Sequence, residues 1–224
     1  MPHLFLLNGQ GACAPKSANA SRIGLRLRCD TGFLIALTIA LLCGSPAFAQ
    51  RGAHAAQAGL DTLVHRSATI VRGSVTSAVV EPHPQFPNIE TVVVTVAVVK
   101  VLKGSAPATY TFRQVLLDPR DTADGGGYRK AGQLLLLLNP VSAYGLTSPV
   151  GMEQGRFRIQ RDAKGKTFAV NGRGNVGLFH EVGERVSDRG IAFSRQAQEM
   201  MRKTSGQASL DSLEDAISTL VGAD

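Results

Sequence analysis

A run of twelve mostly β-branched residues, 91–102, constrains this chain more than any other stretch. Valine or leucine occupies eight of its positions and threonine two. β-Branched side chains pack well on a pleated backbone, so the run predicts a strand. One of its faces would carry the bulky residues Val92, Val94, Val96 and Val98, and the other a smaller, mixed set. A strand with one apolar and one half-apolar face is typical of the interior of a sheet.

Residues 1–49 have the organisation of a signal peptide. Three arginines, at 22, 26 and 28, precede an apolar run over residues 31–42. Ala47 and Ala49 then form an A-x-A pattern, so we expect cleavage before Gln50 and a secreted or periplasmic protein. No twin arginine precedes the run, which indicates a Sec-type signal. The alternatives are an uncleaved anchor, although a bilayer-spanning helix needs about 20 apolar residues, and lipid attachment at Cys43.

Cleavage would leave a chain without cysteine, because Cys13, Cys29 and Cys43 all precede Gln50. The mature fold would then depend on its core alone, with no disulfide and no cysteine chemistry. Removing residues 1–49 takes away four of 24 basic and one of 17 acidic residues, which lowers the formal charge from +7 to +4. The charges are spread along the chain and tryptophan is absent. We therefore expect neither a nucleic-acid partner nor stable membrane insertion after cleavage.

The first half of the mature chain reads mostly as strands. Residues 50–59 are small and polar and predict a flexible arm, and Leu60, Leu63 and Val64 share one face of a short helix over 60–66. Alternating patterns then predict strands over 69–80 and 109–117, on either side of the run 91–102. Gly73 marks a bend or bulge in the first of these strands. Residues 83–88 and 118–132 are turn-rich and polar and predict loops.

The second half begins with strands and ends with helices. The apolar segment 133–138 predicts a short buried strand, and 155–161 and 166–171 flank the turn Asp162–Gly165 as a hairpin. The pattern weakens after Gly172, with helices expected over 193–203 and 209–221. Ser209 can cap the last helix, whose apolar stripe is Leu210, Leu213, Ile217 and Leu220. The pattern as a whole predicts a small closed or half-closed barrel over 60–172, followed by a C-terminal loop and helical tail over 173–224.

Several segments resemble those of a group of secreted bacterial proteins of uncharacterised function. The similar segments are 60–75, 96–104, 132–138, 154–159 and 209–217. The order of elements also resembles the OB-like barrel of netrin modules and of tissue inhibitors of metalloproteinases. The resemblance implies a mainly β (α+β) fold, a five- to six-stranded OB-like barrel with a short N-terminal helix and a C-terminal amphipathic helix. Those inhibitors bind the protease zinc through an N-terminal cysteine, which the cleaved chain lacks, so their mechanism is not implied.

Three patterns look catalytic but lack the context that each requires. Gly172-Arg-Gly-Asn-Val-Gly177 matches a dinucleotide fingerprint, but the segment after it is short and broken by glycine, so we interpret it as a turn. The segment 165–167 matches only the end of a P-loop, and Gln160 stands where the first glycine belongs. His180-Glu181 begins a zincin motif, but Glu184 occupies the position of the second histidine.

Metal ligands show no recognisable spacing either. His54, His65, His83 and His180 lie on separate segments, which favours solvated histidines over a zinc site. The acidic residues Asp118, Asp121 and Asp124 lack the spacing of a calcium loop and are interrupted by Arg120. The G-x-S-x-G elbow of hydrolases does not occur. We therefore predict no catalytic residue, no cofactor and no metal site.

The missing catalytic pattern and the signal peptide together favour a secreted, non-enzymatic binding module. Its contact surface would be formed by the loops His83–Ile89 and Asp118–Lys130, and its partner would be an extracellular or periplasmic protein or a glycan. One alternative is a hydrolytic or metal-dependent enzyme with an unrecognised site. It requires at least two of His83, His180, Asp118, Asp121 and Glu181 to converge in one pocket. A structural envelope protein is the other alternative.

Overall fold

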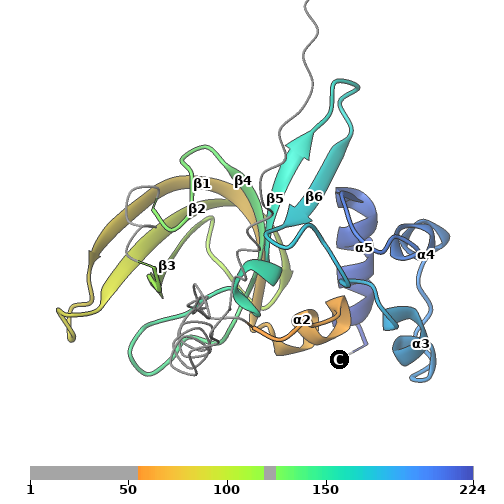
Figure 1. Ribbon diagram of the computed structural model, residues 1–224, viewed down its shortest axis with the longest axis horizontal. Coiled ribbons are helices and arrows are strands. Elements are labelled where there is room, and N and C mark those ends of the chain that lie inside the picture. Colours follow the sequence, from red (N-terminus) through yellow and green to blue (C-terminus); the bar gives the residue numbers. More distant parts are fainter. Residues whose placement is uncertain (1–54, 119–124, 224) are drawn as a thin grey trace, which may run out of the picture. The chain divides into compact units, whose positions relative to one another are not determined.

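The computed structural model describes residues 55–118 and 125–223, which form a mainly antiparallel sheet with helices on one of its faces (Figure 1). The cleavage residues Ala47, Ala49 and Gln50 lie outside the described residues. The elements are α2 Leu60–Arg66, β1 Thr69–Pro82, β2 Glu90–Lys103, β3 Thr109–Val115, β4 Gln133–Leu138, the 3-10 helix η2 Met152–Gln154, β5 Arg156–Arg161, β6 Thr167–Asn171, α3 Val182–Ser187, α4 Arg195–Met201, β7 Ala208–Ser209 and α5 Leu210–Val221.

The strands of this part of the chain follow the order β3-β2-β1-β4-β5-β6-β7. The mainly β class, with a short helix before the sheet and an amphipathic helix after it, is confirmed. The described sheet has seven strands rather than the five or six expected, because a two-residue strand, β7, is added beside β6. The sheet is not closed into a barrel, since β3 and β7 form its two edges. Residues 146–149 nevertheless connect β3 to β4 through single bridges, Arg113 to Leu146 and Leu138 to Pro149.

The predicted strand over residues 91–102 is confirmed as β2, which lies between β1 and β3. Its bulky face is the buried one, because Val92, Val94 and Val96 are all fully inaccessible to solvent. These valines belong to a core on the face opposite the helices, together with Val71, Val75, Phe112, Tyr128, Leu134, Leu136 and Leu138. The second half of β2 leaves this core, and Val99 is 70% exposed.

Gly73 allows β1 to bend where it crosses β2. A Cβ atom at this position would lie 2.3 Å from the carbonyl oxygen of Ala97 on β2, closer than any side chain tolerates. The pairing of β1 with β2 shifts register between Arg72 and Gly73, and again between Val75 and Ser77. The predicted bulge at Gly73 is therefore confirmed, and its cause is a close approach between the two backbones.

Strand β4 is apolar throughout because both of its faces are buried. Leu135 and Leu137 point to the side of the sheet that carries the helices, while Leu134, Leu136 and Leu138 point to the opposite core. Successive side chains on a strand alternate between faces, so a run of five leucines is needed to supply two cores at once. Its prediction as a buried strand is confirmed.

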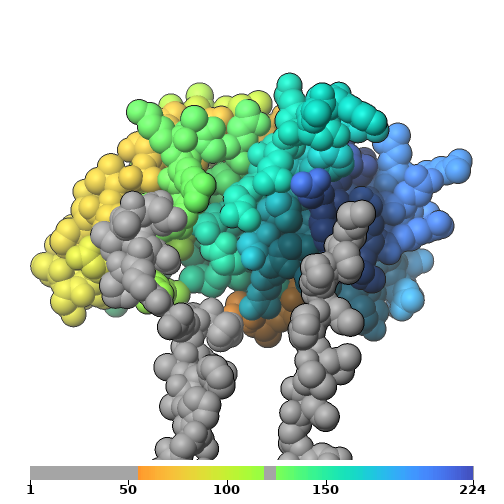
Figure 2. All heavy atoms as spheres, turned by 45° about the horizontal axis from the view of Figure 1, so that its top comes forward, coloured from red at the N-terminus to blue at the C-terminus, as the bar shows by residue number. Residues whose placement is uncertain are grey.

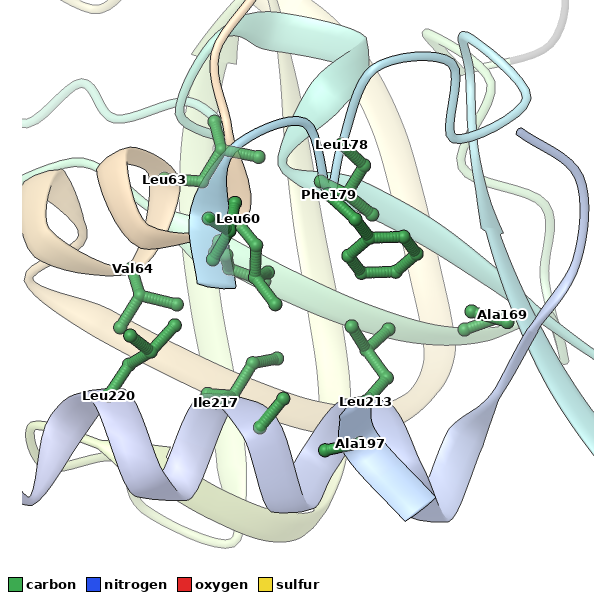
Figure 3. Close-up of a cluster of buried hydrophobic side chains, with 14 of the residues drawn as sticks. Leu60, Leu63, Val64, Ala169, Leu178, Phe179, Ala197, Leu213, Ile217 and Leu220 are labelled. Atoms are coloured by element: carbon green, nitrogen blue, oxygen red, sulfur yellow. The ribbon is translucent and has the colours of Figure 1, made fainter. Parts of the chain in front are cut away.

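The helices form the second core on the other face of the sheet (Figure 3). Leu60, Leu63 and Val64 of α2 meet the stripe of α5, which consists of Leu210, Leu213, Ile217 and Leu220 as predicted. Leu178 and Phe179, which precede α3, fill the space between these helices and the sheet. Ser209 stands at the N-cap of α5, but its side chain makes no capping hydrogen bond. The helix α3 was not predicted from the sequence pattern.

Candidate functional site

The loop between β1 and β2 is compact although it contains two prolines. Backbone hydrogen bonds link His83 N–H to Ile89 C=O at 2.8 Å, Phe86 N–H to His83 C=O at 3.1 Å, and Ile89 N–H to Phe86 C=O at 2.8 Å. The loop stands at the far end of the β1–β2 hairpin, away from α3, α4 and α5 (Figures 1 and 2). Because its backbone is fastened in this way, its side chains are presented in a fixed arrangement.

His83 is buried inside this loop, at 2% exposure, rather than solvated. Its Nδ1 accepts a hydrogen bond from Gln85 N–H at 3.2 Å, and its Nε2 lies 3.0 Å from Tyr144 C=O. A nitrogen that accepts cannot also carry the proton, so the proton is assigned to Nε2, which donates to Tyr144 C=O. The ring thus connects the β1–β2 loop to residues 140–146, a distant segment that follows β4.

Two exposed aromatic rings lie above His83. The ring of Phe86 stacks on the imidazole with centroids 5.2 Å apart, and the ring of Tyr144 meets Phe86 edge to face at 5.4 Å. Phe86 is 37% exposed and Tyr144 58%. We call Phe86 and Tyr144, with His83 beneath them, the aromatic surface.

The segment 140–146 that carries Tyr144 is itself fixed. Ser142 N–H donates to Leu146 C=O at 2.8 Å, and Gly145, with φ of 72°, closes the turn. Thr147 N–H donates to Arg113 C=O of β3 at 2.9 Å, and the Thr147 hydroxyl donates to Asn139 C=O at 2.7 Å. Both loops of the aromatic surface are therefore attached to the sheet through hydrogen bonds to regular strands or to residues adjoining them.

Arg113 on β3 also fixes the base of the β1–β2 loop. Its guanidinium forms an ion pair with Glu81 at 2.6 Å and donates to the Thr91 hydroxyl at 2.7 Å. That hydroxyl in turn donates to Glu81 C=O at 2.7 Å, and Thr91 is fully buried. The end of the hairpin is held in place by three strands at once.

A cavity of about 380 Å³ adjoins the segment 140–146. Its lining residues carry no charge; they are Gln114, Val115, Leu117, Asn139, Pro140, Ser142, Leu146, Thr147, Ser148 and Met152. Leu117 is 52% exposed at its margin, and Val141 nearby in the sequence is 60% exposed. We call this cavity the apolar groove. It is lined by Pro140, Ser142 and Leu146 of the same segment that carries Tyr144.

Of the two loops predicted to contact a partner, His83–Ile89 contributes Phe86 to this surface. The other, Asp118–Lys130, falls partly outside the described residues, at 119–124. Its Tyr128 is buried in the core, where the hydroxyl donates to Gln114 Oε1 at 2.6 Å. The segment 140–146 was not predicted. A usable signal was Pro140-Val-Ser-Ala-Tyr144, which places apolar residues in a turn-rich stretch between strands.

Among the described residues of the enzyme alternative, His83 and the neighbouring pair His180 and Glu181 lie on separate segments. His83 contacts Gln85, Phe86 and Tyr144, whereas His180 is an exposed residue whose Nδ1 lies 3.7 Å from its neighbour Glu181. Asp118 follows β3, and Asp121 and Asp124 lie outside the described residues. Among residues 55–118 and 125–223, no three histidine, cysteine, aspartate or glutamate side chains come together as a metal site would require.

The remaining motifs are turns. Gly165 closes the β5–β6 hairpin, where Asp162 Oδ1 accepts from Lys164 N–H at 2.9 Å and from Lys166 N–H at 2.8 Å. The segment 172–177 follows β6 as successive turns, with Asn171 and Asn175 each accepting the backbone N–H of the other. The helix that a dinucleotide site needs does not begin there. The interpretation of 172–177 as a turn is therefore confirmed.

Comparison of the chain with protein-family models, with curated proteins and with solved structures found no significant match. Within the described residues, no helix is both long enough and apolar enough to cross a membrane.

Proposed function

We propose that this chain is a non-enzymatic binding module that acts outside the cytoplasm and contacts a protein partner through the aromatic surface and the apolar groove. The observation that carries the proposal is the exposure of Phe86 and Tyr144 on two loops whose backbones are hydrogen-bonded in place. Rings exposed in a fixed geometry lose little conformational entropy on binding, which is why aromatic residues dominate the energetics of protein interfaces.

The surroundings of the rings favour a protein over a glycan. Phe86 and Tyr144 meet edge to face with an interplanar angle of 77°, so they do not form one flat platform on which a sugar ring could stack. The groove beside them is lined without a charged residue. Depletion of charge and enrichment of aromatic side chains are the features of the buried centre of a protein–protein interface.

Two finer parts of the proposal are secretion, which rests on the sequence, and an OB-like arrangement of the strands. The signal peptide over 1–49 supports secretion, and the absence of cysteine after Gln50 is consistent with a fold that needs no disulfide. An OB-like arrangement is supported by the order β3-β2-β1-β4 and by the bridges through which residues 146–149 connect β3 to β4. In such a barrel the loops at the end of the first two strands are available for binding.

A photo-crosslinking experiment tests the proposal. A benzophenone amino acid replaces Tyr144 in one version of the secreted protein and Val99 in another, since Val99 is 70% exposed on β2 outside the aromatic surface. We expect a discrete crosslinked protein from position 144 that is absent from position 99. The same product should disappear when Phe86→Ala is added, because the neighbouring ring is removed.

The purified partner then allows affinity to be measured. Phe86→Ala is expected to weaken binding by at least about tenfold, as is typical of a central aromatic contact, while Val99→Ala leaves binding unchanged. Identical crosslinking patterns from the two positions, or equal affinity of the parent and Phe86→Ala, would contradict the proposal.

A further inference from the structure

The face of the sheet opposite the helices changes from apolar to basic between β4 and β5. Leu134 of β4 pairs with Arg158 of β5, and Leu136 pairs with Arg156, so each leucine adjoins an arginine on the same face. Because side chains alternate along a strand, Arg156, Arg158 and Gln160 all project from this face of β5. The intervening Phe157 is buried in the core on the other side.

A cavity of about 540 Å³ lies over this basic face. Strand β4 begins at Gln133, and its last pair with β5 joins Leu134 to Arg158, so residues 159–161 of β5 continue beyond it without a β4 partner. The lining includes residues on both strands at this point, Gln133 and Leu134 of β4 and Arg158 and Gln160 of β5. Its volume is in the range of sites for small molecules.

The walls of the cavity leave room for a ligand to approach the backbone. Gly126, Gly127, Gly132 and Gly172 line it without side chains, and Leu134 adds an apolar part, whereas the side chain of Ile159 packs against the core on the helix side of the sheet. The charged lining residues are three arginines and one glutamate, which gives the described lining a net charge of +2.

The three arginines are not equivalent. Arg156 is already engaged: it donates to Gly126 C=O, pairs with Glu153, and lies over the ring of Tyr128 at 4.7 Å from its centroid. Arg129 and Arg158 line the same cavity, are exposed, and form no ion pair with any described residue. Two guanidinium groups that have no ion-pair partner among the described residues thus line one cavity next to an arginine that is held in position.

We propose that this cavity binds a small organic anion, whose carboxylate or phosphate group is held by Arg129 and Arg158 and whose carbon skeleton rests on Leu134. Guanidinium groups recognise both oxyanions through paired, charge-assisted hydrogen bonds, which account for the charged end of the ligand. The apolar part of the lining accounts for the skeleton. The site is separate from the aromatic surface and does not depend on the function proposed for it.

Four probes show whether the site prefers a carboxylate or a phosphate, and whether it needs the negative charge and the carbon skeleton. Benzoate and phenyl phosphate carry a carboxylate and a phosphate on the same ring, benzyl alcohol is a neutral analogue, and inorganic phosphate has no skeleton. Each is titrated into the secreted protein at low salt while the amide NMR signals of Gly126, Gly127 and Gly132 are followed. We expect saturable shifts with benzoate, phenyl phosphate or both, weaker binding of inorganic phosphate, and none with benzyl alcohol.

Variants test the assignment of the arginines. Arg129→Gln and Arg158→Gln should each weaken binding of the organic anion by at least about tenfold, because each removes a charge-assisted contact. Both arginines are exposed, so the melting temperatures of the two variants should match that of the parent protein. Arg189→Gln, an exposed arginine beyond α3, is the matched control and should bind like the parent, as should Phe86→Ala. The inference is overturned if no probe binds saturably, if benzyl alcohol binds as well as benzoate, or if both arginine variants retain full affinity.

Discussion

The side-chain amide of Gln154 holds the backbone of the N-terminal arm at two places. Its Oε1 accepts a hydrogen bond from Ala58 N–H at 2.9 Å, and its Nε2 donates to Ala56 C=O at 2.8 Å. Arg173 adds a hydrogen bond to Ala55 C=O at 2.7 Å. Residues 55–58 belong to the segment expected to be a flexible arm, and they are attached here because Gln154 is fully buried with its amide directed at them.

The arm also contacts the turn over 172–177 at its last glycine. Gln57 Nε2 donates to Val176 C=O at 2.8 Å, and a Cβ atom at Gly177, where φ is +65°, would lie 3.3 Å from the Gln57 side chain. One glycine of the spacing that resembles a dinucleotide fingerprint, Gly177, therefore lies against the arm, whereas a Cβ atom at Gly172 would collide with Glu153.

Gln154→Ala should release the arm. The backbone groups of Ala56 and Ala58 lose a partner, so the amide of Ala58 is expected to exchange with solvent faster, at a cost of about 1–2 kcal/mol in the free energy of unfolding. Hydrogen exchange followed by mass spectrometry measures both the exchange of the Ala58 amide and the loss of stability. Gln160→Ala, which changes an exposed glutamine on β5, should leave Ala58 as protected as in the parent. Equal protection of Ala58 in the two variants would show that Gln154 does not hold the arm.

The two faces of β2 should respond differently to the same substitution. Val96→Asp places a carboxylate in the core beside Val92 and Val94, where no partner exists, and we expect it to cost about 4 kcal/mol or more and to prevent folding. Val99→Asp introduces the same residue at a site that is 70% exposed, and should cost about 1 kcal/mol or less. The yield of folded protein and thermal melting compare the two variants. Similar melting of both variants would contradict the burial of the Val96 face.

The strands β1 to β6 were predictable because each carries its own signal, whereas the two-residue strand β7 carries none. The strand expected over 109–117 is observed as Thr109–Val115, and the helix expected over 209–221 as Leu210–Val221. Burial on one face imposes alternation on a strand and a stripe on a helix, and both patterns are visible in a single sequence. Even the two-sided burial of β4 follows from its unbroken leucines.

The binding surface was only partly predictable because it joins segments that are distant in sequence. Nothing local in the run 83–89 indicates that His83 will be buried by Tyr144, sixty-one positions later. The edges of the sheet were not predictable from local sequence either, since closure of a barrel depends on whether β3 pairs with a distant strand. The basic face of β5 was visible as alternating arginines in Arg156-Phe-Arg158, but the cavity there is also lined by residues between 126 and 134 and by Gly172, which are not adjacent to β5 in the sequence.

Glu214 should fasten α5 to the sheet. Its carboxylate is 8% exposed and lies 3.0 Å from Arg72 Nε on β1 and 2.8 Å from Lys100 Nζ on β2. Glu214→Ala leaves both cations without this partner, and we expect a loss of about 1–3 kcal/mol in the free energy of unfolding, limited because both cations can be hydrated. Lys100→Ala, whose side chain is 46% exposed, should cost less than about 1 kcal/mol. Denaturant unfolding gives both values, and an unchanged midpoint for Glu214→Ala would refute the attachment.

Tyr128 should make the protein lose stability in alkali. Burial raises the pKa of its hydroxyl well above the usual range, although the positive charge of Arg156 partly opposes the rise. Above about pH 10 the unfolded chain releases this proton while the folded protein retains it, so the folded state binds more protons and stability falls as pH rises.

The variant Tyr128→Phe separates this effect from others. It removes the titrating group and the hydrogen bond to Gln114, so it should be less stable than the parent at pH 8 by about 1 kcal/mol. Tyr110, whose pKa burial also raises, remains in both proteins, so the comparison isolates Tyr128. The difference between the two proteins should shrink and then reverse as the pH rises beyond about 10, because only the parent then suffers the penalty of a retained proton. Denaturant midpoints measured between pH 8 and 11 provide the test, and parallel curves for the two proteins over this range would exclude Tyr128 as the source of the alkaline instability.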